Sequence, residues 1–121
     1  MKKLLITLML ISPFSFADWG DVYYCQMTTH SGVTVEGKRK DYILDKFQFK
    51  LDKTKKAMVF GSSGYFENTE EKLTPYLHWP NQEYWYSSMK HSMAVFDKGK
   101  FLHSVVLSSH ITSVTADCDK F

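Results

Sequence analysis

Apolar and polar residues alternate with a period of two along most of the chain, and this pattern constrains the fold more than any other feature. The clearest case is residues 43–51, where one face carries the apolar side chains of Ile43, Phe47, Phe49 and Leu51. Successive side chains of a strand point to opposite faces of a sheet, so this alternation is typical of strands with one buried face. We therefore expect an all-β protein with little helix.

Turn signals separate the alternating segments. The sequence Asp-Lys-Gly-Lys at residues 97–100 is a strong hairpin signal, and Pro75 and Pro80 exclude an uninterrupted helix or central strand between residues 68 and 81. A short strand is expected at residues 65–67, followed by at most one helical turn. The spacing predicts roughly seven to nine short strands, as in small antiparallel barrels and sandwiches.

Residues 1–17 have the pattern of a cleaved secretion signal. Lys2 and Lys3 precede an apolar run, Pro13 interrupts it, and Ala17 places a small residue at the cleavage position. The apolar run is too short to span a bilayer, and no later segment is long enough. We expect a soluble periplasmic or extracellular protein without a membrane span, in which residues 18–121 form a single β domain.

The charge balance changes once this segment is removed. The 121-residue chain has 15 Lys and Arg against 13 Asp and Glu; the first 17 residues include two of the lysines, so the remaining 104 carry 13 of each sign. A domain without net charge lacks the excess of positive charge by which proteins bind the phosphates of nucleic acids. We expect no nucleic-acid partner, and the length suits one domain.

The two cysteines, Cys25 and Cys118, lie near the two ends of the predicted domain. In an oxidising compartment an even number of cysteines indicates a disulfide, and two cysteines allow one pairing. A bridge requires Cα atoms within about 7 Å, so the first and last strands would be close neighbours. This favours a small up-and-down barrel, while a barrel-like sandwich bridged between its sheets remains open.

Aromatic residues crowd into residues 65–86. Rings with polar tips suit apolar or saccharide ligands, because each ring supplies a large contact area with a hydrogen-bonding group. The alternative is that Trp79 and Trp85 fill the end of a barrel as core. The sequence thus favours a small-molecule binding module, with these candidate ligand-binding residues: Tyr65, Tyr76, His78, Trp79, Tyr84, Trp85 and Tyr86.

Signals for catalysis or metal binding are weak. The five histidines lack the short spacings of zinc sites, so we expect no metal and no cofactor. Residues 61–64 lack the Gly-x-Ser-x-Gly pattern of a nucleophile elbow, and Glu83 has no evident carboxylate partner. We name no catalytic residue and do not expect an enzyme, and we interpret His103 as a hydrogen-bonded core residue.

Two short segments resemble bacterial periplasmic inhibitors of lysozyme. They are Tyr23-Tyr24-Cys25-Gln26 and Gly61-Ser62-Ser63-Gly64-Tyr65. Members of that family are small disulfide-bearing barrels that insert a Ser/Gly-rich loop into the enzyme cleft, with further residues between the last glycine and the tyrosine; here Gly64 precedes Tyr65 directly. The resemblance implies an alternative function, a periplasmic protein-interaction or enzyme-inhibitor domain that acts on an envelope protein or an enzyme through the Gly61 to Tyr65 loop, with Ser62 and Ser63 as the inhibitor-loop contacts.

Overall fold

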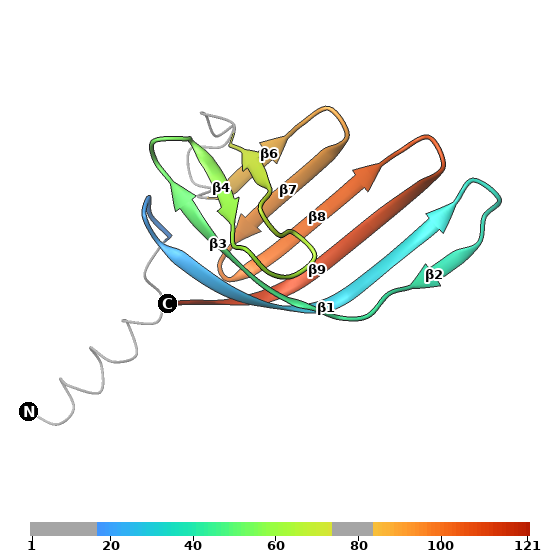
Figure 1. Cartoon of the computed structure of the whole chain (residues 1–121), viewed down its shortest axis with the longest axis horizontal. Coiled ribbons are helices and arrows are strands. Elements are labelled where there is room, and N and C mark those ends of the chain that lie inside the picture. The colour runs from blue at the N-terminus through green and yellow to red at the C-terminus, as the bar shows by residue number, and fades with distance from the viewer. Residues whose placement is uncertain (1–16, 74–83) are drawn as a thin grey trace, which may run out of the picture.

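A computed structural model describes residues 17–73 and 84–121, and these residues form one antiparallel sheet without helix. The order of strands along the chain is shown in Figure 1. The strands are β1 (Val22–Thr34), β2 (Arg39–Asp41), β3 (Lys46–Asp52), β4 (Ala57–Phe60), β5 (Glu70–Lys72), β6 (Trp85–Ser88), β7 (Ser92–Asp97), β8 (Lys100–Val106) and β9 (His110–Lys120).

The sheet curls into a nearly closed barrel, which confirms the predicted fold class. The strand order in the sheet is β5-β4-β3-β1-β9-β8-β7-β6. Neighbouring strands in this order are consecutive in the chain with two exceptions: β3 lies beside β1 because β2 pairs off the path, and the last strand, β9, lies beside the first, β1. Between the described residues, β5 and β6 at the two ends of this order are joined by the single bridge of Leu73 with Ser87. We call this junction the seam.

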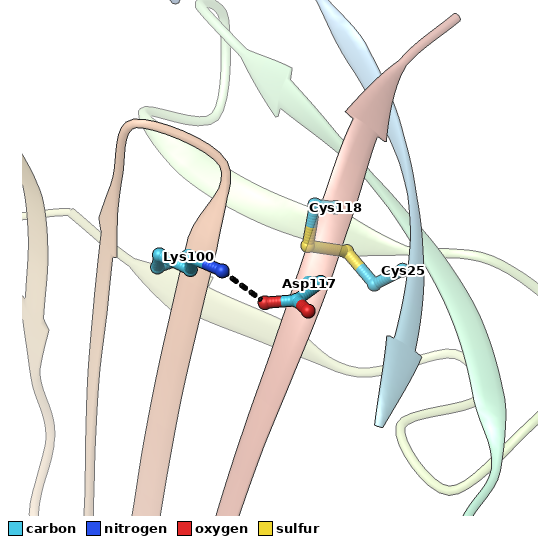
Figure 2. Close-up of a disulfide and its surroundings, with 4 residues drawn as sticks. All are labelled: Cys25, Lys100, Asp117 and Cys118. Atoms are coloured by element: carbon cyan, nitrogen blue, oxygen red, sulfur yellow. Dashed lines mark hydrogen bonds and ion pairs between the residues drawn. A yellow bond between two sulfur atoms is a disulfide. The ribbon is translucent and has the colours of Figure 1, made fainter. Parts of the chain in front are cut away.

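The disulfide joins the first and last strands as predicted. Cys25 and Cys118 are directly opposite each other in the β1–β9 ladder, with Cα atoms 4.0 Å apart. Figure 2 shows the bridge, together with the ion pair between Lys100 on β8 and Asp117 on β9. A link across a sequence separation of 93 residues contributes roughly 4 to 5 kcal/mol of stability in the chain-entropy estimate.

Phenylalanine side chains fill the barrel. The inward-facing positions of successive strands alternate with outward ones, as in the burial of Phe101 and His103 on β8. The largest interior residues pack ring against ring at centroid distances of about 5 to 6 Å. They are Phe47, Phe49, Phe60, Phe66, Phe96 and Phe101.

Strand β1, with 13 residues, is interrupted by a β-bulge. The register against β9 shifts between Met27 and Thr29, and this shift turns His30 and Gly32 inward. The first half of β1 pairs with β3 and the second half with β2. The hairpins β1–β2 and β8–β9 therefore extend together beyond the barrel (Figure 1).

Two local predictions were wrong. Strand β3 begins only at Lys46, and Ile43 is 90% exposed, because residues 42–45 cross from β2 to β3 outside the ladder. Residues 65–67 form a turn, and the strand follows at Glu70–Lys72, where a helical turn was expected. The short strand β2, Arg39–Asp41, is exposed along its whole length.

Candidate functional site

The connection between β4 and β5 carries the predicted serine loop, residues 61–65. Ser62 and Ser63 are exposed at its outer end. Its base is closed by two backbone hydrogen bonds: the Gly61 N–H donates to the Gln48 carbonyl at 3.0 Å, and the Asn68 N–H donates to the Gly61 carbonyl at 2.8 Å. The loop is thus attached to β3 on one side and to itself on the other.

Gly64 seats the loop directly on the beginning of β3. Its φ of +92° lies in the left-handed region, and a Cβ atom there would be 2.5 Å from the Lys46 carbonyl oxygen. Both facts require glycine, since other residues are strained at this φ and would collide with backbone. The serine loop is therefore in contact with the barrel wall.

Phe66 anchors the other end of the loop in the core. It is almost fully buried, and its ring lies 4.8 Å from Phe60, 4.9 Å from Phe47 and 4.7 Å from the His103 ring. The Thr69 hydroxyl donates to the Phe66 carbonyl at 2.7 Å. The exposed pair, Ser62 and Ser63, is consequently followed at once by a glycine contact at position 64 and a buried ring at position 66.

Tyr65 connects the serine loop to a small aromatic group. Its ring is 4.6 Å from His30, which in turn is 4.7 Å from Tyr42. His30 is 7% exposed, and its Nδ1 atom is buried without a hydrogen-bond partner. Burial, and then the nearby Tyr42, raise the pKa of the Tyr65 phenol, so this hydroxyl stays protonated at neutral pH.

A shallow depression lies on the outer wall beside the loop. It has a volume of about 340 Å³ and is lined by residues of β1, β3 and β9 together with Ser63. Among the polar groups that line it are Lys46, Asp117 and Asp119. A partner contacting Ser63 would thus also meet hydrogen-bonding groups of both charges on the wall.

The predicted aromatic site is only partly described. Tyr76, His78 and Trp79 lie outside the described residues. Trp85 is half-buried, and its ring meets Trp19 edge to face at 4.8 Å while both pack against the core. Tyr84 and Tyr86 are half-buried beside Trp85, and Tyr65 packs with His30 on β1 instead.

A buried polar cluster crosses the seam, and no local sequence pattern predicted that its residues come together. The Glu71 carboxylate, on β5, accepts hydrogen bonds from Ser87 on β6 at 3.1 Å, from Ser92 on β7 at 3.0 Å and from Nε2 of His103 on β8 at 2.9 Å. His103 is therefore the inward, hydrogen-bonded histidine that was expected.

The electrostatics of the cluster favour an ionised Glu71. Burial by itself raises the pKa of this carboxyl, but hydrogen bonds from His103 and Ser92, the charge of His103 and the Ser87 hydroxyl outweigh it and lower the pKa. The serines donate to the carboxylate and not to the imidazole, and Ser87 is fully buried. This arrangement differs from a Ser-His-acid triad, in which the serine bonds the imidazole.

Within residues 17–73 and 84–121, no three potential metal-binding side chains come together. In the same part of the chain, no helix has the length and apolar character needed to cross a membrane. The disulfide is typical of proteins outside the cytoplasm. Comparison with protein-family models, curated proteins and solved structures found no match.

Proposed function

We propose that this chain is an exported protein-binding module that acts through the serine loop, in the manner of a lysozyme inhibitor. The observation that carries the proposal is the seating of the loop: Gly64 lies against β3 and Phe66 is buried, while Ser62 and Ser63 remain exposed. A preformed loop loses little conformational entropy on binding, which favours affinity. The leader-like residues 1–17 and the disulfide support export.

The chemistry of the loop suits a cleft that contains carboxylates. Glycoside hydrolases position two carboxyl groups across the scissile bond. Ser62 and Ser63 can each donate one hydrogen bond from the hydroxyl to such a carboxyl group. Neither serine has a bulky side chain that would block entry of the loop into the cleft. The disulfide-linked barrel also agrees with the fold that the resemblance implied.

A lysozyme turnover assay tests this proposal. We expect the wild-type domain to reduce the turnover of egg-white lysozyme, and the double substitution Ser62→Ala, Ser63→Ala to weaken inhibition about tenfold or more, since hydrogen bonds to charged groups contribute about 1.5 to 3 kcal/mol each. The matched control is Ser108→Ala, Ser109→Ala, which alters another exposed serine pair. Equal inhibition by both double variants, or none by the wild type, would overturn the proposal.

A saccharide or small apolar ligand is the second candidate. It is favoured by the ring of Tyr65, which is 42% exposed beside His30 and Tyr42. The phenylalanine-filled interior gives less support to a ligand inside the barrel. Tryptophan fluorescence should respond to a panel of glycans and lipids if Trp79 or Trp85 lines such a site, and flat titrations would count against a site at these tryptophans.

A further inference from the structure

We propose that Glu71 and His103 are positioning residues for the serine loop: together they close the seam and, through Phe66, hold the loop in its binding conformation. The consequence for binding rests on the proposed function, whereas the structural coupling does not. We call Glu71, Ser87, Ser92 and His103 the seam cluster.

The seam is where the barrel has the fewest backbone hydrogen bonds between described neighbours. Strand β5 has three residues, and Leu73, the residue that follows it, forms the bridge to Ser87 of β6. The Glu71 carboxylate accepts hydrogen bonds from β6, β7 and β8 in succession. One side chain of β5 therefore links three strands of the opposite half at the place where the described residues pair through a single bridge.

The carboxylate is a strong link because it is buried. Glu71 is 5% exposed, and a buried carboxylate is tolerated only when it is hydrogen-bonded or paired with a positive charge. Charge-assisted hydrogen bonds are about twice as strong as neutral ones. Removing one donor leaves part of the carboxylate unsatisfied, so opening at the seam becomes easier.

The seam cluster contacts the serine loop through Phe66. The His103 imidazole meets the Phe66 ring edge to face at 4.7 Å, and Phe66 meets Tyr65 in the same way at 4.8 Å. Glu71 lies two residues after Thr69, whose N–H and hydroxyl both donate to the Phe66 carbonyl. A shift of His103 or of β5 is thus transmitted to the anchor of the loop.

Amide hydrogen exchange tests the coupling without any partner. The reporters are the Glu67 and Asn68 amides, which donate to Gly64 and Gly61 and close the loop. In Glu71→Gln we expect these amides to exchange about tenfold faster or more, while the β1–β9 ladder changes less than twofold. Ser92→Ala, which removes one donor at a half-buried position, should give a smaller increase at the same amides.

Two controls distinguish coupling from general destabilisation. Ser104→Ala changes a half-buried serine of β8 outside the seam cluster and should leave the loop amides unchanged. An equal acceleration throughout the barrel, or no acceleration at the loop in Ser92→Ala, would overturn the inference. Should Glu71→Gln fail to fold, Ser92→Ala still decides between these results.

Lysozyme inhibition then separates this inference from the proposed function. If the wild type inhibits, Ser92→Ala should weaken inhibition in proportion to the faster exchange of the loop amides, and unchanged inhibition would contradict a positioning role. If the wild type does not inhibit but exchange at the loop is selectively accelerated, the proposed function fails and the coupling stands.

Discussion

The contact of Gly64 with β3 leads to a specific prediction for Gly64→Ala. A non-glycine residue in the left-handed region costs about 1 to 2 kcal/mol. The new Cβ atom would also lie 2.5 Å from the Lys46 carbonyl oxygen, and overpacking of this kind adds about 1 to 3 kcal/mol. We therefore expect Gly64→Ala to lower the free energy of unfolding by about 3 kcal/mol.

Urea unfolding of the disulfide-bonded domain measures this cost. With a slope of about 1 to 1.5 kcal/mol/M, the midpoint should fall by about 2 to 3 M while the slope is unchanged. The matched control is Gly37→Ala, because Gly37 also has a positive φ, +81°, but a Cβ atom there has no neighbour within 4 Å. The urea midpoint of Gly37→Ala should fall by about 1 M. Equal losses in the two variants would refute the close seating of the loop.

Three further predictions concern the disulfide, the seam cluster and the leader. Replacing Cys25 and Cys118 by serine should lower the free energy of unfolding by about 4 kcal/mol, measured by urea unfolding; a loss below about 1 kcal/mol would contradict the assignment of this bridge as a major constraint. Because the folded-state pKa of Glu71 is lowered, its contribution to stability is present above the ordinary glutamate pKa of about 4.3 and is lost as the pH falls through the lowered pKa. Thermal unfolding between pH 6 and 3 should show a shallower acid loss in Glu71→Gln, and parallel profiles would exclude this role. Mass spectrometry of the exported protein should give the mass of residues 18–121 less two hydrogens, whereas two free thiols or a retained leader would contradict the corresponding assignment.

Much of the barrel could be predicted because its strands keep the period of two. Phe47, Phe49 and Leu51 face inward on β3, and the single possible cysteine pairing correctly joined the first and last strands. Ile43 continues the same alternation but lies in the crossing segment, outside the ladder. Periodicity gives no signal for the point at which a strand leaves its partner, so the boundary was missed.

The two features that fix the candidate site depend on contacts between distant segments. Glu71 meets its partners Ser87, Ser92 and His103 across 16, 21 and 32 residues, and only the curling of the sheet brings them together. The sequence marked Ser62 and Ser63 as a loop, but the need for glycine at position 64 comes from the backbone of β3. Local sequence patterns therefore predicted the loop but not the contacts that hold it in place.

An NMR titration of the isotope-labelled domain, residues 18–121, with egg-white lysozyme shows directly whether the serine loop is the binding element. We expect chemical-shift changes that begin at Ser62 and Ser63, extend to Tyr65 and saturate at a one-to-one ratio. Resonances of buried core residues on the β7–β8 wall should move little. No shift at saturating lysozyme, or shifts that leave the serine loop unaffected, would contradict the claim that this loop is the binding element.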